Sequence, residues 1–292
     1  MKSYVKKVMA IGMTLGLAAC SATDNSSSTS ASGSAGASGS GVEDGVLTVA
    51  MEAAYAPYNW AQPTDANGAV KMKDSELYAN GYDVMTAKKI AEANNWELEI
   101  KQLDWDSLIP AVQSGTVDAV IAGQSMTAER EQEVDFAGPY LYANIVVLTK
   151  KDSQYASAKS LADLAGGKVT SQTGTIWYDT LIPQIDGANR LSASESAPAM
   201  LMALETGQVD YVVTDMPTAE GAVLAYPDMQ IVNLDEGQGF EVSDEDVNIG
   251  VSVRKGNTEL KNKIDEFLAT QTEDDFTAQM EEAVKIQPLE NN

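Results

Sequence analysis

The chain has 292 residues, of which 44% are hydrophobic and 21% are charged, enough for one large domain or two of ordinary size. Its formal net charge of −24 disfavours polyanionic partners such as nucleic acid or an anionic membrane surface. The sequence contains no histidine, which excludes the usual zinc sites, the Ser-His-Asp triad and the Cys-His pair. Carboxylate, lysine and tyrosine chemistry stay open, and we expect neither a metal nor a cofactor.

Residues 1–19 have the pattern of a secretion signal. Three lysines lie within the first seven residues, and a short apolar segment, 8–17, follows them. The tetrad Leu17-Ala18-Ala19-Cys20 resembles the lipobox of bacterial lipoproteins, in which the cysteine thiol receives a diacylglycerol and becomes the new N-terminus. We therefore expect Cys20 to be lipidated. An ordinary signal peptide with an incidental cysteine is the alternative.

Residues 20–45 are rich in Ser, Gly and Ala, which predicts a flexible tether behind the lipidated cysteine. The remaining sequence has no other long apolar segment, so we expect nothing to span a membrane after processing. The expected location is the outer face of the cytoplasmic membrane. This is the cell surface in a Gram-positive organism and the periplasm otherwise.

From Val46 onward, short β-rich runs alternate with amphipathic helical stretches, which predicts α/β units with parallel sheets. The expected strands are 47–50, 98–103, 117–122, 145–149, 168–171, 209–214, 230–233 and 247–253. The expected helices are 83–94, 106–114, 128–134, 161–164, 176–184, 197–206, 217–225, 258–269 and 274–283.

The sequence contains an internal echo. IPAVQSGTVDAVIAG (109–123) and LMALETGQVDYVVTD (201–215) both read as a helix end, a glycine, Val-Asp and an apolar strand, 92 residues apart. The echo predicts two similar lobes rather than one sheet. It sets Gly123 opposite Asp215, each just past the carboxyl end of its strand, where ligands of open α/β sheets bind.

The first of these strand ends, AGQSMTAERE (122–131), carries small residues that allow a ligand to approach the backbone: Ala122, Gly123 and Ser125. Arg130 follows, in the first turn of an expected helix, where the backbone dipole already disfavours a cation. Its planar guanidinium suits a carboxylate, and the helix N-terminal amides favour an anion as well. The alternative is an ion pair with a nearby carboxylate, from Glu131, Glu133 or Asp135.

Two further strand ends carry polar groups. In SQTGTIWYD (171–179), Gln172 and the backbone of 174–176 could bind a polar group, although the segment taken alone favours a plain strand-to-helix turn. In VVTDMPT (212–218), Asp215 suits either an ammonium ligand or the N-cap of the next helix. Aromatic residues in the loop after the first strand, with Trp105, either flank a ligand or close core edges.

Seven segments occur in a characteristic order: LTVAMEAAYAPYNW, GYDVMTAKKIAEANN, LDWDSLIPAVQSGTVDAVIAGQSMTAERE, VDFAGPYLY, SQTGTIWYD, LMALETGQVDYVVTD and VNIGVSVRKGNTELKNKIDEFL. Together they resemble the polar amino-acid-binding proteins of bacterial ABC importers, the family-3 solute-binding proteins, over about residues 46–270. The resemblance implies a two-lobed α/β fold of the periplasmic-binding-protein type II, with two strand crossovers forming a hinge. It also implies a monomer that closes around one free amino acid and delivers it to a membrane permease.

The resemblance also implies the boundaries of the lobes. Lobe 1 would comprise residues 46–140 and 249–292, and lobe 2 residues 145–244. The hinge would be 141–144 and 245–248.

By position, the resemblance implies that Arg130 clamps the α-carboxylate of the ligand, helped by Ser125 and the Gly123 backbone. Asp215 would hold the α-ammonium group. One zwitterion needs these groups together, so each interpretation supports the others.

The same carry-over implies that Tyr55 and Trp105 flank the ligand side chain and that Glu52 faces it. Gln172 and the backbone around Ile176 would line the edge of the second lobe. A carboxylate between two aromatic rings favours a cationic side chain, such as that of arginine, lysine or histidine. An amide side chain such as that of glutamine is the alternative.

Two other function classes stay open. Some proteins with this fold are secreted enzymes such as cyclohexadienyl dehydratases, for which Glu52 could serve as a general acid; others are ligand sensors. The segment 61–81 is longer than the usual hairpin of the family, and the C-terminal segment lacks the family's aromatic-rich ending. The sequence assigns a role to neither segment.

Overall fold

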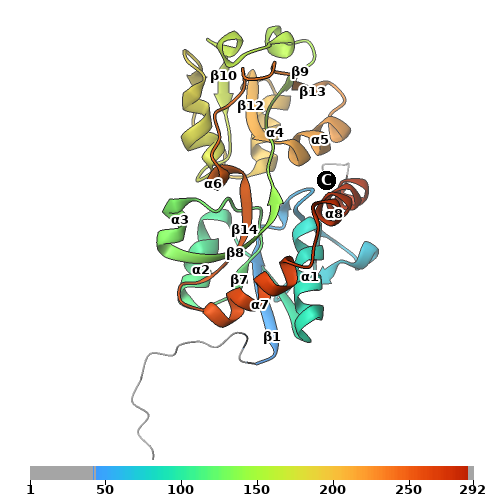
Figure 1. Cartoon of the computed structure of the whole chain (residues 1–292). Coiled ribbons are helices and arrows are strands. Elements are labelled where there is room, and N and C mark those ends of the chain that lie inside the picture. Colours follow the sequence, from blue (N-terminus) through green and yellow to red (C-terminus); the bar gives the residue numbers. More distant parts are fainter. Residues whose placement is uncertain (1–41, 43, 289–292) are drawn as a thin grey trace, which may run out of the picture. The chain divides into compact units, whose positions relative to one another are not determined.

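The computed structural model describes Val42 and residues 44–288, so the signal segment, Cys20 and most of the tether lie outside the described residues. Within this part, the chain forms three sheets with helices packed against them (Figure 1). None of the helices described here is long and apolar enough to cross a membrane.

The first sheet has the strand order β6-β1-β7-β14-β8. Its parallel members are β1 (Val46–Met51), β6 (Glu97–Gln102) and β7 (Ala119–Val120). Two antiparallel strands complete it, β14 (Asn248–Arg254) and β8 (Val134–Tyr142). Three helices pack against this sheet, α1 (Tyr82–Asn94), α2 (Leu108–Ser114) and α7 (Thr258–Leu268). Apolar side chains of the sheet and of these helices, among them Leu47, Val49 and Ile90, are fully buried.

The second sheet has the order β11-β10-β12-β9-β13. Three strands are parallel, β11 (Asn189–Arg190), β10 (Lys168–Thr170) and β12 (Tyr211–Asp215). The other two are β9 (Ile145–Lys150) and β13 (Met229–Val232), and β9 runs antiparallel to both of its neighbours. Helices α4 (Ala197–Glu205) and α5 (Met216–Ala225) pack on this sheet. Both sheets are therefore mixed, whereas the sequence pattern predicted parallel sheets.

The third sheet is small and antiparallel, and it accounts for the segment 61–81. Its order is β2-β3-β5-β4, with β2 (Ala54–Tyr55), β3 (Asn59–Gln62), β5 (Tyr78–Asn80) and β4 (Val70–Lys71). A bridge between Met72 and Ile100 connects it to the first sheet. The sheet thereby holds the loop that follows β1, which carries several of the predicted site residues.

The internal echo has a structural counterpart in each of the two large sheets. Gly115 and Gly207 each follow the end of a helix, and both have a positive φ, 75° and 72°. Three residues further on, Asp118 accepts a hydrogen bond from the backbone N–H of Thr48 at 2.8 Å, and Asp210 accepts one from Lys168 at 2.7 Å. In each case the aspartate secures the start of the neighbouring parallel strand. The 92-residue repeat is thus one αβ unit built twice.

The chain passes between the two large sheets at two adjacent places. β8 ends at Tyr142 and β9 begins at Ile145. The return runs through α6 (Asp244–Val247) into β14, which pairs with β8 in register Asn248 to Tyr142 (Figure 1). The backbone N–H of Ala143 donates to the carbonyl of Val247 at 2.7 Å, so the two crossings are hydrogen-bonded to each other.

Several elements differ from the sequence prediction. The expected helix 176–184 is a π-helical turn, Trp177–Leu181, followed by a 3₁₀ turn, Ile182–Gln184, because Pro183 cannot continue an α-helix. The segment 161–164 is a 3₁₀ turn, Leu161–Leu164. Strand β8 was not expected, since it contains Gly138-Pro139. It lies at the edge of its sheet, where a proline is tolerated.

The C-terminal helix α8 (Glu273–Ile286) packs on α1 and on α5. These two helices cover different sheets, α1 the first and α5 the second. It begins with a capping box formed by Thr272 and Asp275. The amide of Gln279 donates to the carbonyl of Tyr82 at 3.1 Å and to the hydroxyl of Thr86 at 2.7 Å. These contacts give the C-terminal segment, whose packing the sequence left open, a defined place.

Candidate functional site

Seven of the ten predicted ligand-binding residues line one cavity between the loops of the two large sheets. The free space inside it is only about 10 Å³, close to what a single water molecule needs, so in this conformation the lining side chains nearly fill the cavity. The lining residues are Tyr55, Trp105, Gly123, Ser125, Arg130, Gln172, Thr175, Ile176 and Trp177. Of the other three predictions, Ala122 is buried and does not line the cavity, whereas Glu52 and Asp215 lie next to it through contacts described below.

Arg130 lies in the short helix α3 (Ala128–Glu133), which Thr127 caps by accepting from the Arg130 backbone N–H. Its guanidinium donates to two backbone carbonyls, of Ser125 at 2.8 Å and of Gly174 at 3.0 Å. The guanidinium carbon lies 5.5 Å from the centre of the Trp105 ring. Desolvation lowers the pKa of Arg130 to about 10.

The acidic neighbours of Arg130 in the sequence do not pair with it. Asp135 pairs with Lys255 at 3.5 Å, and Glu133 accepts from the Gln113 amide at 3.3 Å. Among the ion pairs found in the described residues, none includes Arg130. The geometry therefore leaves a half-buried guanidinium in the cavity with neutral partners, a place suited to an anion.

A buried polar network fixes the Gly123 loop. The Gly123 N–H donates to the Tyr140 hydroxyl at 3.0 Å, and that hydroxyl donates to Asp83 at 2.7 Å. Asn59 donates to the other oxygen of Asp83 at 2.7 Å. Burial raises the pKa of Asp83 to about 6, against the lowering effect of these hydrogen bonds. The network ties β8, α1 and the third sheet to the loop beside Arg130.

Asp215 has one of the two roles that the sequence allowed, the helix cap, and makes a second contact. It is the N-cap of α5, where one carboxylate oxygen accepts from the Thr218 N–H at 2.9 Å. The other oxygen accepts a hydrogen bond from the hydroxyl of Tyr55, which comes from the third sheet. Asp215 is fully buried, and desolvation raises its pKa although the Tyr55 hydrogen bond lowers it. In the part of the chain that the structure describes, none of the ion pairs includes Asp215.

Glu52 follows β1 and is 7% exposed. The amide of Gln172, which follows β10, donates to both of its carboxylate oxygens, at 3.2 and 3.3 Å. Burial raises the pKa of Glu52 to about 7. Glu52 lines a second, larger cavity of about 520 Å³ together with Trp105, which also lines the first one. The Glu52–Gln172 pair thus stands between the two cavities.

Aromatic side chains form the walls around these polar groups. Tyr55 stacks on Tyr58 with ring centres 4.6 Å apart, and the Trp177 ring lies 6.2 Å from Tyr55. Sequence reasoning missed the site residues Thr175 and Trp177. Their position next to Ile176 could have indicated them, but only a backbone role was expected for that segment.

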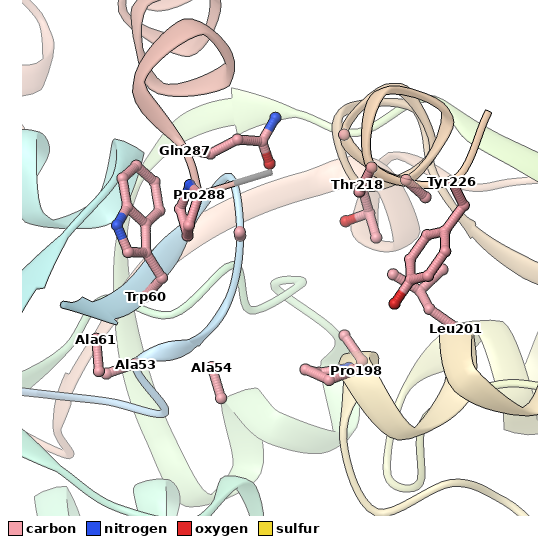
Figure 2. A pocket seen from close by; sticks show the side chains of 15 residues that line it. Ala53, Ala54, Trp60, Ala61, Pro198, Leu201, Thr218, Tyr226, Gln287 and Pro288 are labelled. Carbon is pink, nitrogen blue, oxygen red and sulfur yellow. The ribbon is translucent and has the colours of Figure 1, made fainter. Parts of the chain in front are cut away.

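A third pocket is lined mainly by small apolar side chains. Figure 2 shows Trp60 and Gln287 along one side and Pro198, Leu201, Thr218 and Tyr226 along the other. Gln287 packs so closely on α5 that a Cβ at Gly221 would lie 2.7 Å from its side-chain oxygen. The described residues contain no group of His, Cys, Asp and Glu side chains that could hold a metal ion.

Comparison with known proteins gives consistent matches. The sequence profile of the bacterial extracellular solute-binding proteins, family 3, matches residues 47–283. The chain is 28% identical over 280 residues to the arginine-binding extracellular protein ArtP of Bacillus subtilis, covering 92% of each chain.

Two solved structures are similar as well. The amino acid ABC transporter substrate-binding protein AbpA of Streptococcus pneumoniae, bound to L-arginine, has a TM-score of 0.69 and 29% identity over 82% of this chain and 95% of that one. An ancestral arginine-binding protein bound to glutamine has a TM-score of 0.67 and 32% identity, over 82% and 98% of the two chains.

Proposed function

This chain belongs to the bacterial extracellular solute-binding proteins of family 3, which are the amino-acid-binding components of ABC importers. We propose that it binds a free basic amino acid. The observation that carries the proposal is the charge pattern of the site. One guanidinium, Arg130, and two buried carboxylates, Asp215 and Glu52, each have only neutral hydrogen-bond partners among the contacts described above. A basic amino acid carries the complementary set, one carboxylate and two cations.

The α-carboxylate of the ligand binds at Arg130. The guanidinium presents a planar pair of donors, and the nearby Gly123 and Ser125 lie in the same cavity wall. Trp105 supports the guanidinium from its face, at 5.5 Å.

The two carboxylates divide the cationic groups of the ligand. Asp215, at the end of β12, holds the α-ammonium, because the loop after β7 and the loop after β12 are equivalent ends of the repeated αβ unit. Glu52 holds the cationic end of the side chain, which passes between Tyr55 and Trp105. Glutamine, whose amide could also reach Glu52, is the neutral alternative.

Binding proceeds by closure of two lobes around a hinge. Lobe 1 comprises 46–140 and 249–292, lobe 2 comprises 145–244, and the hinge comprises 141–144 and 245–248. The adjacent crossings at Ala143 and Val247 support this assignment. The ligand favours the closed form only by contacts that it makes better there, namely those with both lobes at once.

The protein acts outside the cytoplasm, in keeping with its family. We further propose that residues 1–19 are removed, that Cys20 carries a lipid and that the protein works as a monomer on a membrane permease. Mass spectrometry of the purified membrane fraction tests the lipid. Detection of Cys20 with a free thiol behind an uncut leader would rule it out.

We also propose that the chain catalyses no reaction, like the binding proteins that it resembles. Glu52 is the residue that a dehydratase would use as an acid, since its pKa lies near 7. Incubation with prephenate and with arogenate is expected to leave both compounds unchanged. Formation of an aromatic product would overturn this part of the proposal.

The substitution Arg130→Ala tests the site directly. We expect arginine binding, measured by isothermal titration calorimetry, to weaken at least about 30-fold, because truncation removes one partner of a desolvated charge pair. Arg190→Ala is the matched control, since Arg190 lies on the Tyr178 ring at 3.8 Å, away from the cavity. Equal affinity of the Arg130 variant and the control, with both folded, would refute the site.

A further inference from the structure

Three pairs of residues are joined by hydrogen bonds at the site, each between a residue of the second large sheet's loops or strand ends and one from the first sheet's side, the small third sheet included. Gln172 donates to Glu52, Tyr55 donates to Asp215, and Arg130 donates to the carbonyl of Gly174 at 3.0 Å. Each contact joins a charged group to a neutral one, an amide, a phenol or a backbone carbonyl. The charged groups are the three that the proposed function assigns to the ligand.

In this structure the charged groups of the site thus form hydrogen bonds with neutral groups of the protein itself. A ligand that reaches these groups has to replace the neutral partners. A ligand group with the opposite charge adds Coulomb attraction to the hydrogen bond that it makes, so such a ligand gains by the exchange. A neutral ligand group gains little, since it only exchanges one neutral donor for another.

The Glu52–Gln172 contact is the most restrictive of the three. Gln172 is 2% exposed, and its backbone is held on both sides, by a bridge to Ser194 and by the Thr175 hydroxyl at 2.7 Å from its carbonyl. The backbone carbonyl of Glu52 accepts from Gln102 at 3.0 Å. With both backbones fixed, the contact ends only when a side chain turns away or the two sides separate.

We propose that Gln172 is a specificity-determining residue that competes with the ligand side chain for Glu52. This inference rests on the proposed function. A guanidinium or ammonium displaces the Gln172 amide from Glu52, whereas an amide side chain exchanges with it at no gain. A side chain too short to reach Glu52 leaves the contact intact. The wild-type site therefore favours basic amino acids and treats glutamine no better than alanine.

The larger cavity beside Glu52 supports the exchange. Glu52 lines it together with Asp104, Asp106 and Glu195, and no lysine or arginine lies among its lining residues. The space leaves room beside Glu52 for a cationic terminus that takes the place of the Gln172 amide. The surrounding carboxylates favour a cation there over a neutral group.

The substitution Gln172→Met removes the amide and keeps the length of the side chain. Titration calorimetry compares arginine, glutamine and alanine, the weaker ligands by displacement of arginine. We expect the affinities for arginine and for glutamine to rise about tenfold relative to alanine, since both ligands then reach Glu52 without displacing an amide. The expected change in affinity follows from the strength of a hydrogen bond to a charged group, about 1.5–3 kcal/mol, because about 1.4 kcal/mol corresponds to a tenfold change in affinity.

Gln184→Met is the matched control, because Gln184 donates to the Glu241 carbonyl at 2.9 Å, away from both cavities. Should the Met variant fail to fold, Gln172→Asn, whose shorter amide falls short of Glu52, replaces it. A loss of arginine affinity in the variant, or unchanged affinities of arginine and glutamine relative to alanine, would overturn the role of Gln172 while leaving the proposed function intact. Absence of amino-acid binding in the wild-type protein would instead overturn the proposed function itself.

Discussion

Glu52 is a carboxyl group that burial holds near its titration point at neutral pH. Its pKa of about 7 lies above the ordinary value of 4.5, because desolvation disfavours the charged form. In the ligand-free protein the folded state therefore binds this proton more tightly than the unfolded state does. The contribution of Glu52 to stability is largest below about pH 4.5 and falls as the pH rises to about 7.

The affinity for a cationic ligand is expected to depend on pH in the opposite direction from the stability. A cation on Glu52 favours the ionised form, so binding releases the proton and the affinity for arginine rises with pH. We expect arginine to bind about tenfold more tightly at pH 8 than at pH 6, by proton linkage through a pKa near 7. Titration calorimetry at the two pH values measures this ratio.

The variant Glu52→Gln isolates the effect, since Asp83 and Asp215 are present in both proteins. In the variant the pH ratio should shrink towards that of the remaining groups. An identical ratio in the two proteins would show that Glu52 does not meet the cation.

At the level of single residues, the sequence was informative where the chemistry was unusual. Arg130 stood out because a cation is unfavourable at the start of a helix. Asp215 was ambiguous, and the structure shows both of its contacts, with the Thr218 N–H and with the Tyr55 hydroxyl. The hydroxyl contact was not predictable, because it joins residues 160 positions apart through the packing of two sheets.

The elements around the site depend on one buried tyrosine. Tyr140 in β8 donates to Asp83 and accepts from the Gly123 N–H, so it joins strand, helix and ligand loop. We expect Tyr140→Phe to lower the free energy of unfolding by about 1–3 kcal/mol, because it leaves buried polar groups without their partner. Denaturant unfolding measures the change.

Tyr142→Phe provides the control on the same strand, since Tyr142 is 57% exposed. The control should change the stability by no more than about 0.5 kcal/mol. Equal effects of the two substitutions would show that the network does not secure the loop.

Helices and strands with clear periodicity were predicted to within a few residues, as for α1 and β9. The prediction failed where tertiary contacts decide the conformation. Gly138-Pro139 reads as a break in the sequence, yet β8 continues through it because one side of the strand has no neighbour in its sheet. The π-helical turn at Trp177–Leu181 has no periodic signal of its own.

At the scale of the molecule, the 92-residue echo indicated two lobes from the sequence alone. The structure gives it a physical basis, since Asp118 and Asp210 make equivalent hydrogen bonds to neighbouring strands. Periodicity could not reveal which loops meet across the lobes. Those contacts, including Glu52–Gln172, join residues 120 positions apart and depend on tertiary packing rather than on local propensity.

The most direct test of the account is titration calorimetry of the wild-type chain, without its first 45 residues, against the twenty amino acids at pH 7.5. We expect a basic amino acid to bind most tightly, with a dissociation constant of about 1 μM, equivalent to about −8 kcal/mol. Aspartate or glutamate as the tightest ligand, or no binding by any amino acid, would contradict the assignment of Arg130, Asp215 and Glu52.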